Sequence, residues 1–327
     1  MYNSVHQHKR KSQDLLGRVL YAYNKSSKAS RHSNSTTVEH RLDKYVLKRP
    51  EAGPLKKVSP TDSENFRKVK VLCWIMTSPK TLYAKALYIK QTWGPRCDVT
   101  LYMSSKADPT FPAIGLPVEE GRQNLWNKTL NAFNYIYQNH FNDADWFMKA
   151  DDDTYVIVDN LRYFLSDKNS SEGVYFGHHF KTLSKKGYMS GGAGYVMSKE
   201  ALRLFGTKGK SDNACDVRSG ASEDVQMGRC LTAVGVHPGD SRDSQKRARF
   251  LPLALRDFIQ GRLPYWYHSY KKYNVAKGPG CCSDYLISCH YVTPSNMQML
   301  DFYVYRLRSA GNDGQHIYRV GNKTVPI

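Results

Sequence analysis

Residues 145–153 read Asp145-Trp146-Phe147-Met148-Lys149-Ala150-Asp151-Asp152-Asp153, a mostly apolar run that leads directly into three carboxylates. Short apolar runs with aromatic residues are typical of buried strands. In folds that alternate strands with helices, ligands bind beyond the carboxyl ends of the strands. The stretch therefore predicts a buried strand whose end carries a ligand site.

Strand and helix patterns alternate on both sides of this stretch. Apolar runs predict strands at residues 71–76, 99–103, 145–150, 173–177 and 195–197. Helical spacing of apolar residues predicts helices at 83–93, 125–140 and 155–165, and two more that begin near Ser198 and Ser222. This order predicts an α/β fold with a Rossmann-like, mixed but mostly parallel sheet that is flanked by helices.

The chain divides by composition into a tail and one large domain. Residues 1–65 are polar and rich in lysine, serine and histidine, and they predict a disordered stem. Residues 66–310 predict one large catalytic domain, or two tightly joined halves, and residues 311–327 predict a C-terminal tail. The sequence contains no apolar run of about 18 residues and no signal-peptide pattern. We therefore expect nothing in this chain to span a membrane.

The chain carries a formal net charge of +19, which attracts polyanions such as nucleic acid, anionic membranes or the phosphates of a nucleotide. Part of this charge lies in the first 70 residues, where a solvated segment explains it. No nucleic-acid-binding motif is recognisable. We therefore expect no nucleic-acid partner.

The chain has 7 cysteines, and they do not fall into the C-x₂-C pairs of a structural zinc site. Disulfides explain them better, with Cys73–Cys97 and Cys215–Cys230 as plausible pairs. Cys281, Cys282 and Cys289 would then share one bridge. Adjacent residues have Cα atoms only about 3.8 Å apart, so a Cys281–Cys282 bond would be strained and Cys289 is a competing partner. Their pairing stays open.

Oxidised cysteines indicate a secretory compartment. N-glycosylation sequons give weak support for the same compartment. They begin at Asn24, Asn34, Asn127, Asn169 and Asn322.

Three successive carboxylates repel one another, and a divalent cation would relieve that repulsion. Asp151 and Asp153 would point the same way and form a D-x-D arrangement, with Asp152 directed elsewhere. Such a pair suits Mn²⁺ or Mg²⁺ with a diphosphate. The alternative is a helix N-terminus decorated with acids before Tyr155, which the helix dipole favours.

Other candidate residues have plain structural alternatives. Glu223-Asp224 opens an apolar-periodic segment and reads equally as acidic helix capping, with Ser222 as another cap. A lone His290 is more often a packed residue than a ligand. The glycines at 191, 192 and 194 permit either close approach to a ligand or a tight turn. The aromatic stretch 265–273 could stack on sugars or pack a loop-rich region.

Several long segments resemble the β1,3-galactosyltransferases of glycosyltransferase family 31. The resemblance runs from about residue 69 to residue 307. It rests on VLCWIMTSP (71–79), EGRQNLWNKT (120–129), DADWFMKADDDTYVIVDNLR (143–162), YMSGGAGYVMSKEAL (188–202), SEDVQMGRC (222–230), GDSRD (239–243), GPGCCSDYLIS (278–288) and HYV (290–292).

The resemblance implies a GT-A type fold and an Mn²⁺-dependent, inverting reaction. It also implies UDP-galactose as donor and, as acceptor, the 3-hydroxyl of GalNAc on Ser or Thr of a glycoprotein. Members are type II Golgi membrane proteins, so we expect a Golgi-lumenal protein whose membrane anchor is absent from this sequence. We also consider a homodimer.

The matching motifs assign a role to individual residues. The implied catalytic base is Asp224, and the implied metal ligands are Asp151, Asp153 and His290. The implied donor-binding residues are Lys90, Lys128, Asp152 and Tyr188. The implied acceptor-binding residues are Glu223, Gly192 and Trp266.

Two stretches depart from the family pattern. His178-His179 replaces arginines that relatives carry after YFG, and Lys271-Lys272 interrupts the aromatic stretch around Trp266. Both departures bear on the acceptor pocket. Two other functions stay open: a non-catalytic, client-binding relative of the same fold, and a family member that uses another UDP-sugar or acceptor. The polar positions at Asp151, Asp153, Asp224 and His290 favour the enzyme.

Overall fold

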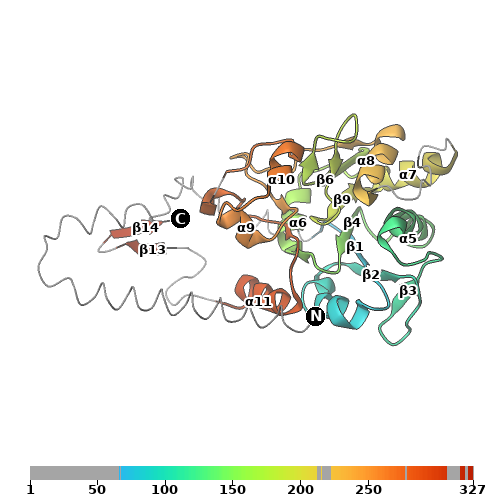
Figure 1. Cartoon of the computed structure of the whole chain (residues 1–327), viewed down its shortest axis with the longest axis horizontal. Helices are drawn as coiled ribbons and strands as arrows, with labels where there is room; N and C mark the ends of the chain where they lie inside the picture. Colours follow the sequence, from blue (N-terminus) through green and yellow to red (C-terminus); the bar gives the residue numbers. More distant parts are fainter. Residues whose placement is uncertain are drawn as a thin grey trace, which may run out of the picture. The chain divides into compact units, whose positions relative to one another are not determined.

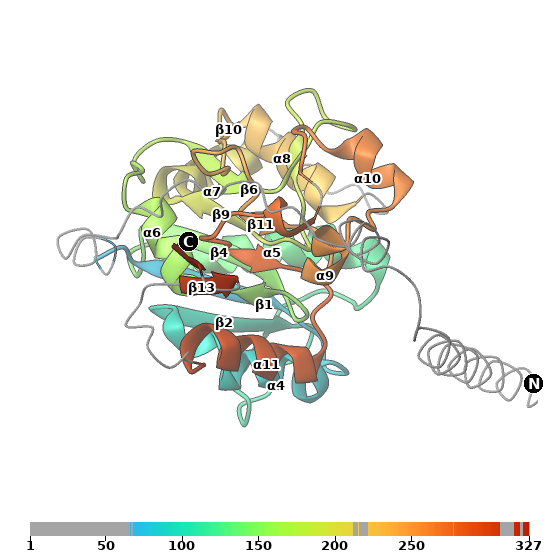
Figure 2. The same cartoon turned by 90° about the vertical axis from the view of Figure 1, so that its left-hand side faces the viewer.

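A seven-stranded mixed sheet forms the centre of the domain, with strands in the order β10-β6-β9-β4-β1-β2-β3 (Figure 2). Its strands are β1 Val71–Met76, β2 Val99–Ser104, β3 Ala113–Gly115, β4 Trp146–Asp151, β6 Val174–Gly177, β9 Tyr195–Ser198 and β10 His237–Pro238. Strand β1 pairs in parallel with β2 and β4, whereas β9 runs antiparallel to β4 and β6. The predicted α/β fold with a mixed, mostly parallel sheet is confirmed.

The computed structural model describes residues 66, 68–211, 215, 222–276, 278–307, 317–320 and 323–326. All of them belong to the unit Arg49–Ile327. The predicted stem, residues 1–65, lies outside the described residues. Within the predicted tail, β13 (Ile317–Val320) pairs in antiparallel register with β14 (Lys323–Pro326). No described helix is both long and apolar enough to cross a bilayer.

Both faces of the sheet are buried, because alternate side chains of each strand enter different cores. Cys73 and Ile75 of β1 face a core completed by α4 (Leu87–Gln91), α6 (Val158–Leu165) and α11 (Pro294–Tyr305). Trp74 and Met76 face the other core, with α5 (Leu125–Asn139), α7 (Lys199–Ser211) and α8 (Glu223–Ala233). Figure 1 shows α5 on one side of β1 and β4, and α6 and α11 on the other. Helices on both faces were predicted.

A second, three-stranded sheet lies at the end of β4 and brings a distant segment to it. Its strands are β5 (Tyr155–Val156), β11 (Phe250–Leu251) and β12 (Ser288–Cys289). Cys289 pairs with Tyr155, and the Val292 N–H donates to Asp153 O at 2.9 Å. This pairing places His290 beside the three aspartates.

The remaining elements are short. The helical turns are η1 (Leu82–Ala86), η2 (Gly94–Arg96), η3 (Arg122–Asn124) and η4 (Gly278–Gly280), and the short α-helices are α9 (Leu255–Ile259) and α10 (Tyr265–Tyr270). The strands β7 (His179–Phe180) and β8 (Tyr188–Met189) form a hairpin.

Two predicted helices differ from those observed. The helix predicted at 155–165 begins only at Val158, because Tyr155 and Val156 pair with β12 instead. The helix predicted at 83–93 is a π-helical turn, η1, followed by α4, which ends at Gln91. Tertiary pairing and irregular helical turns are not encoded in local apolar spacing.

Three disulfides occur among the described cysteines. Cys73–Cys97 and Cys215–Cys230 confirm the two predicted pairs. Of the remaining three cysteines, Cys281 and Cys282 form a disulfide, and Cys289 is a free, buried thiol.

Candidate active site

The carboxyl end of β4 carries a cluster of three potential metal ligands. Asp151 is the last residue of β4, and His290 follows β12. His290 Nε2 lies 3.1 Å from an Asp153 oxygen and 3.8 Å from an Asp151 oxygen. One ligand atom from each residue lies within 4.8 Å of the others. Two carboxylates and an imidazole at this spacing suit a divalent cation.

Asp152 points away from this cluster, as predicted. Its Oδ2 accepts a hydrogen bond from Thr77 Oγ1 at 3.0 Å. Lys85 Nζ lies 3.5 Å from Asp152 and 3.1 Å from Asp153. Burial would raise the pKa of Asp153, but the hydrogen bond and charge of His290, together with Lys85, lower it to about 2. Asp153 is therefore ionised at neutral pH.

The helix-capping interpretation of the three aspartates is wrong. Helix α6 begins at Val158, and Ile157 is its N-cap residue. The aspartates end β4 and form the turn before β5. They therefore do not lie in the first turn of a helix.

Two glycines of the 191–194 segment leave space for functional side chains. A Cβ added to Gly192 would lie 2.2 Å from the His290 ring. A Cβ added to Gly191 would lie 2.5 Å from Glu223 Oε2. Gly192, predicted to line the acceptor site, thus contacts the candidate metal ligand His290. Gly194 has a φ of +73°, which glycine adopts without strain.

Glu223 and Asp224 open α8 and lie at the same edge of the sheet. Glu223 is buried, and its Oε1 accepts hydrogen bonds from Tyr195 OH at 2.8 Å and Thr129 Oγ1 at 3.1 Å. Asp224 accepts from the backbone N–H groups of Gly191, at 3.2 Å, and Val225, at 2.9 Å. Burial raises the pKa of both carboxyl groups. Asp224 is therefore a fixed and comparatively basic carboxylate.

Lys149 connects Asp151 to Glu223. This residue was not predicted from the sequence. Its side chain in β4 is 1% exposed. Nζ donates to Asp151 at 2.6 Å and to Gly191 O at 3.1 Å, and it lies 3.6 Å from Glu223. Burial would lower the pKa of Lys149, but attraction by Asp151 and then Glu223 raises it above its ordinary value. A charged residue within an apolar strand was the signal that could have revealed it.

Of the residues predicted to bind the donor, Lys128 and Lys90 differ in their surroundings. Lys128 is buried and donates to Thr77 O at 2.7 Å. Thr77 also donates to Asp152, so Lys128 and Asp152 contact the same residue. Lys128 Nζ also forms an ion pair with Glu120 at 2.7 Å. Lys90 instead donates to Phe111 O at 2.6 Å, and its ammonium lies over the Phe111 ring.

Tyr188 and Trp266 belong to an aromatic cluster around Phe180 of β7. The Phe180 ring lies 5.6 Å from Tyr188 and 6.1 Å from Trp266. Burial raises the pKa of Tyr188, and the negative charge of Asp224 adds to that effect. Trp266 is 44% exposed. The cluster therefore runs from the side of Asp224 to an exposed aromatic surface.

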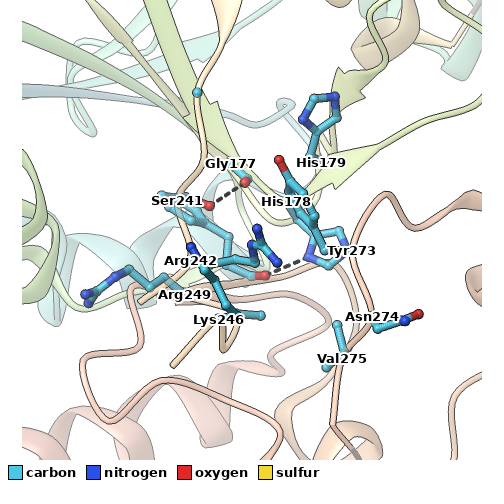
Figure 3. A pocket seen from close by; sticks show the side chains of 13 residues that line it. Gly177, His178, His179, Ser241, Arg242, Lys246, Arg249, Tyr273, Asn274 and Val275 are labelled. Carbon is cyan, nitrogen blue, oxygen red and sulfur yellow. Dashed lines mark hydrogen bonds between the residues drawn. The ribbon is translucent and has the colours of Figure 1, made fainter. Parts of the chain in front are cut away.

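A pocket lies at the end of β6, beside the aromatic cluster (Figure 3). His178 and His179, which differ from the family pattern, line this pocket. None of the predicted site residues lines it. His178 Nδ1 donates to Phe250 O and His179 Nε2 to Lys186 O, each at 2.9 Å, because a carbonyl oxygen only accepts. Burial lowers the pKa of both histidines to about 4. Both histidine side chains are therefore neutral at pH 7.

Comparisons with known proteins show which proteins this chain is similar to. The family described as Fringe-like matches residues 70–283. Glycoprotein-N-acetylgalactosamine 3-beta-galactosyltransferase 1 of Xenopus laevis is 46% identical over 252 residues, which cover 76% of this chain and 69% of that protein. Beta-1,3-glucosyltransferase of Mus musculus is 24% identical over 208 residues, covering 62% and 41%. The solved galactosyltransferase LgtC covers 73% of this chain and 98% of its own at 12% identity, with a TM-score of only 0.39.

Proposed function

Because this chain belongs to the Fringe-like family, we propose that it is an inverting galactosyltransferase. It transfers galactose from UDP-galactose to the 3-hydroxyl of GalNAc linked to Ser or Thr of a glycoprotein. One observation carries the proposal: Lys149 contacts Asp151 of the ligand cluster and lies next to Glu223, the neighbour of Asp224. A cation-binding group and a basic carboxylate thus share one edge of the sheet.

The ligand cluster fits a divalent cation by the chemistry of its donors. Asp151 and Asp153 offer hard carboxylate oxygens, and His290 offers an imidazole nitrogen. These three residues would hold Mn²⁺, which, when bound, supplies positive charge to a leaving diphosphate. The Gly192 position leaves room for the His290 ring, and Lys149 and Lys85 hold neighbouring carboxylates.

Asp224 is the proposed proton acceptor. In an inverting transfer, the acceptor hydroxyl attacks the anomeric carbon from the face opposite the leaving group, and the bond to the diphosphate breaks. The diphosphate leaves with the bonding electron pair, and the hydroxyl proton goes to Asp224. A raised pKa makes the ionised Asp224 a stronger base than a solvated aspartate. Its two backbone hydrogen bonds fix its direction.

The other site residues follow from their positions. On the donor side we propose Lys128 and Asp152, which both contact Thr77, together with Tyr188. We also propose Lys90 on the donor side, although its ammonium group donates a hydrogen bond to Phe111 O.

On the acceptor side we propose Glu223, Gly192 and Trp266. Trp266 offers an exposed ring that can stack on a sugar face. Glu223 is next to the proposed base in sequence and holds Tyr195 and Thr129. A non-catalytic, client-binding role is disfavoured, because it would leave the buried charges of Glu223 and Lys149, and the paired Asp151, without a use.

The disulfides support an oxidising compartment, and we propose the Golgi lumen. The homodimer stays a prediction.

A donor and acceptor screen tests the function. UDP-galactose, UDP-glucose and UDP-GlcNAc are offered with GalNAc-peptide, GlcNAc and fucose acceptors, with Mn²⁺ or with a chelator. We expect transfer of galactose in β1,3 linkage to GalNAc when Mn²⁺ is present and no transfer when the chelator is present. Transfer that resists the chelator contradicts the metal role, and transfer of another sugar contradicts the donor assignment.

A further inference from the structure

Exposed or half-exposed lysines gather around the β7–β8 hairpin and the end of α10. We call them the basic rim: Lys181, Lys185, Lys186, Lys246, Lys271 and Lys272. None of them forms an ion pair with another residue that the structure describes. Uncompensated charges of one sign on one surface produce a local field that attracts anions.

Backbone contacts hold most of the basic rim together. Phe180 forms a β-bridge with Lys271, and the Lys272 N–H donates to His179 O at 3.0 Å. The Lys181 N–H donates to Tyr270 O at 2.8 Å. The hairpin and the segment after α10 therefore form one surface.

Tyr273 extends this surface to the pocket of Figure 3. Its ring lies 3.6 Å from the Arg242 guanidinium and 5.4 Å from Lys272 Nζ. Arg242 is held by Asp240 at 2.7 Å, so that pair is neutral. Lys246 lines the same pocket, and no carboxylate does. The net charge of the surface is therefore positive and comes from the lysines.

The basic rim borders the proposed acceptor site. Phe180 is bridged to Lys271, and its ring contacts the rings of Trp266 and Tyr188. Tyr188 packs on α8, because a Cβ added to Gly228 would lie 2.5 Å from the Tyr188 Cβ. Asp224 lies in the first turn of that helix. A series of contacts therefore links the lysines to the helix that carries Asp224.

We propose that the basic rim binds carboxylate side chains of the acceptor polypeptide that flank its sugar-bearing residue. This inference rests on the proposed function and names the class of acceptor. An anionic membrane offers the same charge, but a membrane held at this surface would cover the approach to Asp224. Each exposed ion pair contributes about 1.4- to 5-fold in affinity, and salt screens it because the Debye length is about 10 Å at 0.1 M.

A pair of double variants separates the basic rim from net charge. K271Q/K272Q removes two rim charges. The control, K68Q/K70Q, removes two exposed charges just before β1, at the edge of the sheet opposite the carboxyl ends of the strands. Both variants change the net charge of the protein equally.

The experiment uses three GalNAc-threonine peptides that differ only in flanking Asp, Gln or Lys residues. Transfer is measured as kcat/KM at low salt and at about 0.5 M NaCl, and binding by anisotropy of the labelled peptides. We expect wild type to prefer the Asp peptide over the Gln peptide. K271Q/K272Q should reduce that preference about 2- to 25-fold, high salt should also reduce it, and the control variant should preserve it.

Equal kcat/KM for the Asp and Gln peptides with wild type overturns the proposal, as does an equal loss in both variants. Vesicles of anionic lipid that bind through Lys271 and Lys272, without any peptide preference, assign the surface to a membrane and also overturn it. Transfer to the Gln peptide reports on the proposed function separately. If no peptide accepts galactose, the proposed function fails, and anisotropy still decides whether the surface prefers carboxylates.

Discussion

Replacing Lys149 by methionine tests the charge network that joins the two halves of the site. Lys149 is 1% exposed and donates to Asp151 at 2.6 Å, and its Nζ lies 3.6 Å from Glu223. Methionine fills a similar volume but removes the charge. Breaking a buried ion pair by removing one partner destabilises a protein by about 3–5 kcal/mol, because the remaining charge is left uncompensated. We expect a loss of this size in the free energy of unfolding.

The assay is denaturant unfolding of the purified, oxidised protein, monitored by tryptophan fluorescence at neutral pH without metal. A second variant, K149M/E223Q, also removes the charge of Glu223. It should recover part of the loss, because residues in one charge network are not additive. A loss below about 1 kcal/mol for Lys149→Met, or no recovery in the double variant, would refute the network.

Three further predictions concern the ligand cluster and the base. Gly192→Ala should weaken metal-dependent UDP binding by about 10-fold or more, because the added Cβ would lie 2.2 Å from the His290 ring; calorimetric titration measures it. Asp153→Ala should weaken UDP binding in Mn²⁺ far more than in its absence, and equal effects in both conditions would exclude the metal role. Because burial raises the pKa of Asp224, the acid limb of the kcat/KM profile should fall at a higher pH than a solvated aspartate gives, and wild-type activity that persists to pH about 4 would contradict this.

The strands and the edge that carries the site could be predicted from local sequence. The apolar run at residues 71–76 gives β1, and the mostly apolar run at 146–150 gives β4. The carboxylates after β4 mark the ligand edge. Helix α5 follows from apolar spacing and was predicted to within one residue. These features depend on contacts between near neighbours in the chain, which periodicity records.

The assembly of the site depends on pairings between distant segments. His290 reaches Asp153 only because Cys289 pairs with Tyr155, and neither strand is longer than two residues. Such short strands are specified by tertiary packing rather than propensity. The family resemblance identified His290 as a candidate metal ligand. Its position in an apolar stretch, taken by itself, indicated a packed residue. Lys149 was missed because its role depends on Glu223, which follows it by 74 positions.

The most direct test of the central claim is the turnover of Asp224→Asn with UDP-galactose and a GalNAc-peptide, with UDP affinity in Mn²⁺ measured on the same sample. Asparagine keeps the shape of Asp224 but cannot accept the proton. Turnover should fall by about 10²- to 10⁴-fold, while UDP affinity stays within about twofold of wild type, because Asp224 is not among the residues of the ligand cluster. Undiminished turnover would contradict the claim that Asp224 and the Asp151–Asp153–His290 cluster form one catalytic site.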